Sequence, residues 1–189
     1  MRDTTFLLVR HGETDWNVQR RIQGHSDDAG LTEHGVAQVR AAAERLLTSG
    51  ATRIISSDLV RARETAQLIA LRLKLPIEFD AHLRERSYGE LEGHSLDELT
   101  PEGSGFSHGV IVDLNAAAPG GESIAQVKER VVDTLDRLAH DYPGEIIIIV
   151  THGGVIRTLR AAQSSSMLGH EWSQVDNAEI WEMSVPVRS

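Results

Sequence analysis

Two histidines lie shortly after apolar runs of the sequence, at positions where side chains often take part in catalysis or binding. His11 follows the run 6–9 and His152 follows the run 145–150, and each is followed by glycine. An imidazole can act as a nucleophile or carry a proton, and a neighbouring glycine lets backbone amides approach an anion. A lone histidine is usually a surface or core residue, but two in the same setting favour a functional role. We expect the other histidines at the surface: His25, His34, His82, His94, His108, His140 and His170.

Two arginines accompany these histidines. Arg10 directly precedes the first histidine, and Arg61 falls in the first turn of a helix predicted after the run 53–56. The planar guanidinium fork matches phosphate oxygens better than an ammonium group does. Two arginines and two histidines in one place could therefore surround the three equatorial oxygens of a phosphoryl group. The alternative is a solvated helix face on which Arg61 and Arg63 pair with Glu64.

The apolar runs that precede these residues predict the strands of a central sheet. Residues 6–9 and the run Ile-Ile-Ile-Ile-Val within 145–150 are apolar on both faces, which suits buried parallel strands, and 53–56 is a weaker third candidate. Residues 177–185 alternate more, as a strand at a sheet edge does. Because ligands of open α/β sheets bind beyond the carboxyl ends of the strands, we expect both histidines at the same edge.

Helical patterns lie between the predicted strands. Apolar side chains repeat at helical spacing in the segments 36–47, 59–73, 124–138 and about 155–163. Thr32 can cap the first of these helices and Gly50 lies just past its end, while Pro76 stops the second. The alternation of strands and helices predicts a three-layer α/β/α sandwich with a mostly parallel central sheet.

The segment 86–121 does not fit this alternation. It holds seven of the 16 glycines and two of the five prolines, and its apolar residues show weak periodicity. We interpret it as a lid inserted over the sheet edge rather than as a linker. The chain is long enough for one domain of ordinary size, so we expect residues 1–189 to form a single domain that includes this lid.

Composition and charge exclude several classes of function. The net charge is −9 and the chain has no cysteine. A negative surface repels nucleic acid and anionic membranes, so neither is an expected partner. Disulfides, zinc–thiolate sites and cysteine nucleophiles are excluded. No apolar run is long enough for a secretory signal or a membrane span, so we expect a soluble cytoplasmic protein, and its oligomeric state stays open.

Metal sites are not indicated either. His11 and Glu13 have the His-x-Glu spacing of zinc deaminases, but the cysteines that complete such a site are missing. The sequence contains no His-Glu-x-x-His pattern and no acidic cluster with the spacing of a magnesium site. We therefore expect neither a metal nor a cofactor.

Four motifs carry a resemblance to a known family. They are Arg10-His11-Gly12-Glu13-Thr14-Asp15-Trp16-Asn17, Ser57-Asp58-Leu59-Val60-Arg61-Ala62, the segment 83–93 (LRERSYGELEG) and Thr151-His152-Gly153-Gly154. In this order, spread over nearly the whole chain, they resemble the histidine phosphatase superfamily, in particular its phosphoglycerate mutase-like group. Two positions depart from the family pattern: Gly30 stands where proline is common, and Leu91 where tryptophan is common. We expect the first to affect only a turn and the second to alter the pocket wall.

The resemblance implies a role for each matching residue. His11 matches the nucleophile that becomes phosphohistidine, and Glu85 matches the proton donor. The residues implied to hold the phosphate or the substrate are Arg10, Arg61, His152, Asn17, Gln23 and Gly24. To these we add Gly153, because the amides at the start of its predicted helix can approach an anion.

A glutamate needs a raised pKa to donate a proton at neutral pH. The ordinary pKa of this side chain is about 4.3, and two effects are expected to raise it at Glu85: the nearby phosphate dianion and partial burial under the lid. Glu85 can then protonate the leaving alkoxide and later accept a proton from the attacking water. The alternative for Glu85 is a salt bridge with Arg84 or Arg86 at the base of the lid.

Together these inferences predict a metal-independent phosphomonoesterase that acts through phosphohistidine on a small phosphorylated metabolite. A cofactor-dependent phosphoglycerate mutase would use the same chemistry and return the phosphoryl group to the substrate. The third possibility is a catalytically inactive member that serves as a binding module. The presence of every matched catalytic residue weighs against it.

The charges of the lid favour hydrolysis over mutase activity. Residues 87–123 contain no Lys or Arg and seven acidic residues. A mutase needs cations that hold a second anionic group of its substrate. We therefore expect the lid to repel bisphosphates and to favour monoesters whose remainder is neutral or hydrophobic. A cation that reached the site from elsewhere, such as Arg20, Arg21 or Lys128, would overturn this expectation.

Overall fold

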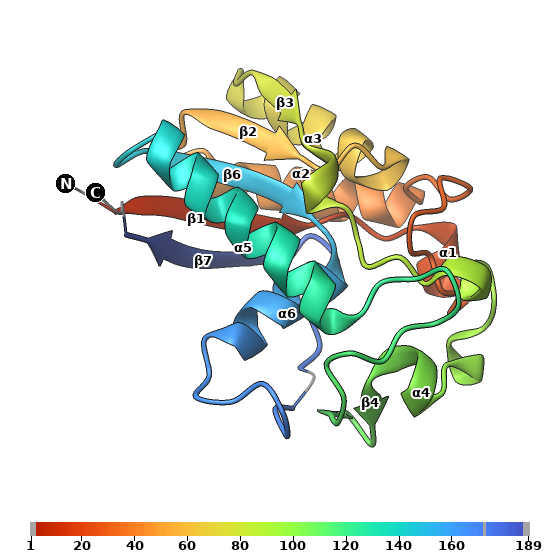
Figure 1. Cartoon of the computed structure of the whole chain (residues 1–189). Coiled ribbons are helices and arrows are strands. Elements are labelled where there is room, and N and C mark those ends of the chain that lie inside the picture. The colour runs from red at the N-terminus through yellow and green to blue at the C-terminus, as the bar shows by residue number, and fades with distance from the viewer. Residues whose placement is uncertain (1–2, 172, 187–189) are drawn as a thin grey trace.

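The computed structural model describes residues 3–171 and 173–186, and within these ranges the main sheet has five strands (Figure 1). Their order is β3-β2-β6-β1-β7, with β1 at Thr4–Arg10, β2 at Arg53–Ser56, β3 at Ile77–Phe79, β6 at Ile146–Thr151 and β7 at Ile180–Val185. β7 pairs antiparallel with β1 at one edge, and the other neighbouring strands are parallel. The mostly parallel sheet and the C-terminal edge strand predicted from the sequence are confirmed.

Helices cover both faces of this sheet (Figure 1). On one face lie α2 (Glu33–Leu46) and α3 (Val60–Leu73), and on the other lie α5 (Ile124–Asp141) and α6 (Gly153–Ala162). Successive strand side chains point to opposite faces, so Leu7 and Val9 of β1 join the α2–α3 core while Phe6 and Leu8 join the α5–α6 core. Two covered faces explain why β1 is apolar at consecutive positions, and they confirm the three-layer arrangement.

Local signals set the ends of the helices. The Thr32 hydroxyl accepts a hydrogen bond from the Gly35 amide and caps α2, as predicted. A short turn leads from the end of α2 to Gly50, whose φ of 75° is in the left-handed region that favours glycine. α6 begins at Gly153, immediately after His152, so its N-terminus lies at the carboxyl edge of the sheet.

The lid, residues 86–121, contains only short elements beyond η1 (Ala81–Leu83). These are η2 (Gly89–Leu91), η3 (Leu96–Glu98), α4 (Pro101–Ser104), β4 (Phe106–Ser107) and β5 (Val110–Ile111). The lid lies beyond the carboxyl ends of the parallel strands, on the same side as α1 (Asp15–Val18) (Figure 1). The buried guanidinium of Arg86 donates to the backbone oxygens of Ser104, Ala116 and Glu122, and so closes the segment into a compact loop.

Candidate active site

The pairing of β1 with β6 brings two histidines together. Arg10 is in register with Thr151, so the next residue of each chain segment is a histidine at the same level. The ring centroids of His11 and His152 lie 5.3 Å apart, with 58° between the ring planes. The structure thus places both histidines at the carboxyl edge of the sheet, where the strand ends predicted them.

A pocket of about 170 Å³ opens beside His11. Its lining residues are Arg10, His11, Asn17, Arg21, Ile22, Gln23, Gly24, Arg61, Glu85, Tyr88, Leu96, Gly153 and Arg157. Every site residue expected from the sequence is in this set except His152. That histidine is buried beside His11, and its Nε2 lies 2.8 Å from the Ser57 hydroxyl.

The surroundings of His11 leave its Nε2 available as a nucleophile. His11 is 3% exposed, and its Nδ1 lies 2.7 Å from the Gly12 backbone oxygen. A carbonyl oxygen only accepts hydrogen bonds, so Nδ1 carries the proton and Nε2 carries the lone pair. Burial, and then the charges of Arg61 and Arg10, hold the pKa of His11 well below its ordinary value of 6.5. The imidazole is therefore neutral at neutral pH, the form that can attack phosphorus.

Close packing fixes the end of β1 and requires glycine after the histidine. A Cβ on Gly12 would lie 2.7 Å from the Gly35 oxygen and 2.8 Å from Cγ2 of Val39 in α2. The Gly12 amide donates to the Thr65 hydroxyl of α3 at 3.1 Å. Two helices therefore hold the backbone on which His11 sits.

Arg61, which is buried, and Arg10, which is partly buried, are cations beside His11. Arg61 is 1% exposed and donates to the backbone oxygens of Gly24 and Ser26, at 2.7 and 2.9 Å. Arg10 donates to the Val175 oxygen at 2.5 Å. Burial is the main cause that lowers the pKa of each arginine to about 10, so both stay charged at neutral pH. Within the described residues their Nε atoms are buried without a hydrogen-bond partner, and these donors suit phosphate oxygens.

The interpretation of Arg61 as part of a solvated helix face is wrong. Glu64 does not pair with it but accepts a hydrogen bond from the Leu31 amide at 2.8 Å. Arg63 is exposed and lies 5.4 Å from the centre of the Phe79 ring. The loop that contains Gly24 covers Arg61 and makes the first turn of α3 an interior position.

Glu85 faces the N-terminus of α6. Its Oε2 accepts from the Gly154 amide at 2.9 Å, and its Oε1 accepts from the Arg86 amide at 2.8 Å. A Cβ on Gly154 would overlap Oε1, so glycine makes room for the carboxylate. The alternative salt bridges are not formed: Arg84 pairs with Asp58, and the Arg86 guanidinium binds backbone oxygens. The carboxylate of Glu85 lines the pocket instead.

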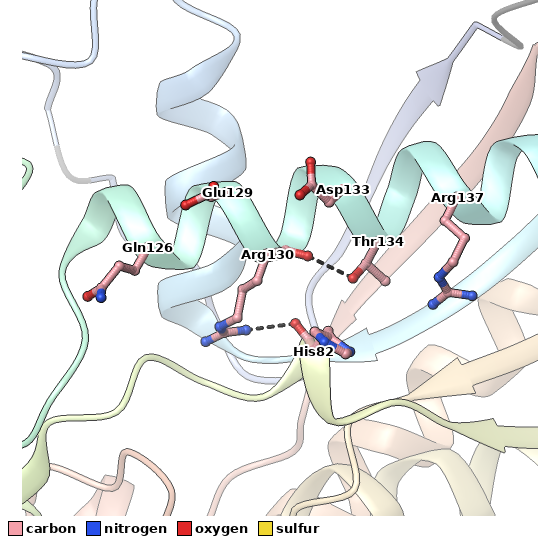
Figure 2. A pocket seen from close by; sticks show the side chains of 7 residues that line it. All are labelled: His82, Gln126, Glu129, Arg130, Asp133, Thr134 and Arg137. Carbon is pink, nitrogen blue, oxygen red and sulfur yellow. Dashed lines mark hydrogen bonds between the residues drawn. The ribbon is translucent and has the colours of Figure 1, made fainter.

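Arg130 of α5 holds the backbone that carries Glu85. Its Nη1 donates to the oxygens of His82 and Arg84 at 2.7 and 2.9 Å, and its Nη2 donates to the Glu85 oxygen at 2.9 Å. Its Nε and Nη2 also bind the Glu122 carboxylate. Figure 2 shows this side chain reaching from α5 to His82 across a surface groove that shares no lining residue with the pocket at His11.

The structure adds residues that the sequence analysis did not single out. Arg157 lines the pocket from α6, and a signal for it existed, since it follows Gly153 by four residues and so shares its helix face. Tyr88 also lines the pocket, and burial raises the pKa of its hydroxyl. Two of the histidines expected at the surface, His25 and His170, are only partly exposed, and the Nε2 of His25 donates to the Glu85 backbone oxygen at 2.8 Å.

The expectation of an acidic lid facing the pocket is also wrong. The lid residues in the lining are Tyr88 and Leu96, whereas Arg21 reaches the pocket from the loop after α1. Lid carboxylates are directed elsewhere: Glu92 accepts from the backbone amides of His25 and Tyr88. The cations of the pocket therefore come from outside the lid.

These groups together form a pocket suited to phosphoryl transfer. A neutral imidazole, several guanidinium groups and a carboxylate all face one small space. In residues 3–171 and 173–186, no group of three or more His, Asp or Glu side chains lies close enough together to hold a metal ion.

The motifs identified in the sequence agree with a match over most of the chain. A model of the histidine phosphatase superfamily (branch 1) matches residues 6–186. The chain belongs to this superfamily. The four motifs and the pocket they form therefore lie within the matched region.

Relatives in the histidine phosphatase superfamily include enzymes with different names. Phosphoglycerate mutase-like protein 4 of Arabidopsis thaliana is 40% identical over 158 residues, which cover 81% of this chain and 68% of that protein. The structure of mycobacterial glucosyl-3-phosphoglycerate phosphatase with VO3 is 32% identical with a TM-score of 0.82, covering 94% of this chain and 91% of that one. A phosphoserine phosphatase variant from Entamoeba histolytica, solved with phosphoserine, is 29% identical with a TM-score of 0.79, covering 95% and 89%.

The two positions that depart from the superfamily pattern lie outside the pocket lining. Gly30 lies beside the Glu64 carboxylate in the turn before α2, and Leu91 packs near Gly103 in the lid. The expectation that Leu91 alters the pocket wall is therefore wrong.

Proposed function

We propose that this chain is a metal-independent phosphomonoesterase that acts on a small phosphorylated metabolite through a phosphohistidine at His11. The observation that carries the proposal is the buried, neutral imidazole whose Nε2 holds the lone pair. The guanidinium groups of Arg10 and Arg61 supply cationic donors beside it. A lone pair in line with phosphorus and fixed positive charge around its oxygens are what phosphoryl transfer needs.

In the first half of the reaction, Nε2 of His11 attacks phosphorus as the ester P–O bond breaks. The leaving alkoxide takes its proton from Glu85, which lines the same pocket. In the second half, water attacks the phosphohistidine while Glu85 accepts its proton. The P–N bond breaks, inorganic phosphate leaves, and neutral His11 and protonated Glu85 are restored.

A cofactor-dependent mutase is the second candidate. Relatives such as the Arabidopsis protein carry a phosphoglycerate mutase-like name, and a mutase would return the phosphoryl group to substrate rather than to water. Because Arg21 and Arg157 line the pocket, lid charge alone no longer separates the two functions. Hydrolysis is favoured by the mycobacterial and Entamoeba structures, both of which are named phosphatases.

Phosphate release and isomerisation, measured side by side, test this proposal. We expect monophosphates to be hydrolysed to free phosphate. In the presence of 2,3-bisphosphoglycerate, we expect the conversion of 3-phosphoglycerate to 2-phosphoglycerate to be at least about tenfold slower than this hydrolysis, a barrier difference of roughly 1.4 kcal/mol. A mutase rate well above the hydrolysis rate in the presence of 2,3-bisphosphoglycerate would favour the mutase. Failure to turn over any monoester would favour a binding protein without catalytic activity.

We further propose that the enzyme works in the cytoplasm with a small phosphate monoester as its partner, rather than with nucleic acid or a membrane. Its net charge of −9 supports this choice, since negative surfaces repel both. None of the helices in the described ranges combines the length and apolar character needed to cross a membrane.

A further inference from the structure

His25 makes contacts that the reaction proposed above does not use. It belongs to the loop between α1 and α2, immediately after Gly24, and it is partly exposed. It does not line the pocket at His11. Its ring and its backbone amide nevertheless bind two other segments, one of which carries Glu85. Any effect of His25 on the reaction is therefore exerted through these segments.

The imidazole of His25 donates a hydrogen bond to the backbone of the proposed acid. Its Nε2 lies 2.8 Å from the Glu85 backbone oxygen and 3.8 Å from the Glu122 carboxylate. The first distance is that of a hydrogen bond, and the second is too long for one. A carbonyl oxygen only accepts hydrogen bonds, so Nε2 of His25 carries the proton.

Two side chains from different elements share the Glu85 backbone oxygen. Arg130 of α5 donates to it from Nη2 at 2.9 Å, and His25 donates to it from the loop. A carbonyl oxygen has two lone pairs, so these two donors satisfy it. Arg130 holds this backbone to α5, whereas His25 holds it to the loop that covers Arg61.

The loop around His25 is itself bound to the proposed phosphate site. Arg61 donates to the backbone oxygens of Gly24 and Ser26 at 2.7 and 2.9 Å, and these residues flank His25. On the other side, the His25 amide donates to Glu92 Oε1 of the lid at 2.9 Å. Residues 24–26 are thus fixed both to a phosphate-binding arginine and to the lid.

We infer that His25 is a positioning residue that fixes the carboxylate of Glu85 relative to a phosphate bound by Arg61. The inference rests on the proposed phosphatase function. A continuous path leads from Arg61 through residues 24–26 and the His25 ring to the Glu85 backbone, with hydrogen bonds at both ends. A general acid must lie within hydrogen-bond reach of the leaving oxygen, so this path keeps the acid in place beside the ester.

Two substitutions separate the hydrogen bond of His25 from its packing. His25→Phe keeps a planar ring and removes the donor, whereas His25→Gln removes the ring and keeps an N–H donor. We expect His25→Phe to slow the burst with sn-glycerol 3-phosphate about tenfold, and the burst with p-nitrophenyl phosphate less than about threefold. His25→Gln should keep both bursts within about threefold of the wild type. If His25→Phe folds poorly, His25→Ala carries the same test.

Inhibition by inorganic phosphate separates positioning from a general loss of structure. In His25→Phe, Arg61 still has the backbone oxygens of Gly24 and Ser26. We therefore expect the inhibition constant of phosphate to stay within about twofold of the wild type, since ground-state binding is retained. The control is His140→Phe, the same exchange at an exposed position of α5, which should leave the bursts and this constant unchanged.

The outcomes distinguish a failure of this role from a failure of the phosphatase function. Unchanged bursts in His25→Phe, equal slowing with both esters, or a large rise in the inhibition constant of phosphate each overturn the positioning role. A loss in His25→Gln as large as that in His25→Phe also overturns it, because the donor is then not what matters. If the wild type releases phosphate from neither ester, the phosphatase function is rejected and the positioning role with it.

Discussion

A test of Glu85 distinguishes a pocket that donates a proton to the leaving group from a pocket that only binds phosphate. An alkoxide needs a proton as the ester bond breaks, whereas p-nitrophenolate needs little help. We therefore expect Glu85→Gln to slow the burst phase by roughly 10²-fold or more for an alkyl phosphate, and much less for p-nitrophenyl phosphate. The burst should be measured by rapid quench, because it reports the first step alone. In the second step, Glu85→Gln should slow the activation of water for both substrates.

Glu90→Gln is the matched control for this experiment. Glu90 is an exposed lid carboxylate that does not line the pocket, so its replacement should leave both bursts unchanged. Equal burst-phase losses for the two substrates in Glu85→Gln would show that Glu85 is not the acid.

Single residues also show how far a sequence can predict a site. His11 and His152 could be placed because each follows a strongly apolar strand, and parallel strands end at a common edge. The burial of Arg61 could not be derived in this way, since it depends on the loop at Gly24 that folds over it. Arg21 reaches the pocket for a similar reason, because its position depends on a β-bridge to the lid that no local pattern encodes.

At the scale of elements, Arg130 ties α5 to the backbone that carries the proposed acid. Arg130→Gln would release the oxygens of His82, Arg84 and Glu85 and let the carboxylate move. Because small misplacements of catalytic groups are costly, we expect the alkyl phosphate burst to fall about tenfold or more, with a smaller effect on p-nitrophenyl phosphate. This dependence on the leaving group is the readout, since a general loss of folded protein would affect both substrates alike.

Arg137→Gln, on the same helix, is the control for Arg130. Arg137 pairs with Asp80 and Asp141 at the surface, and Figure 2 shows it farther along α5. Its replacement should preserve the ratio of the two bursts. If Arg130→Gln slows both substrates equally, Arg130 contributes to stability and does not position Glu85.

The elements differ in how well the sequence predicts them. β6 lies at the centre of the sheet between β2 and β1 and is buried on both faces. Its isoleucine-rich run is therefore easy to recognise in the sequence as a buried strand. β3 escapes prediction because it has three residues, none of them buried, at the sheet edge. The internal structure of the lid is set by contacts distant in sequence, such as those of Arg86 with backbone oxygens. Its weak periodicity could therefore show only that the segment departs from the alternation of strands and helices in the rest of the chain.

At the scale of the whole molecule, the net charge of the chain is negative, whereas the side chains that line the pocket are mostly positive. The chain carries a net charge of −9, yet four arginines line the pocket. Because these side chains can neutralise a bound phosphate, we expect exhaustive dialysis against EDTA to leave the rate of phosphate release unchanged. Activity that is lost on dialysis and restored by Mg²⁺ would contradict metal-independent catalysis.

The phosphohistidine at His11 is tested most directly by trapping the labelled enzyme. A phosphoramidate is labile in acid and stable in base, unlike an acyl or seryl phosphate. After reaction with a ³²P-labelled monoester and a base quench, we expect acid-labile label on the peptide that contains His11. Label and turnover should both be absent from His11→Ala and present in His34→Ala, which removes an exposed histidine of α2. Label on serine or aspartate, or base-stable label that persists in His11→Ala, would contradict the mechanism.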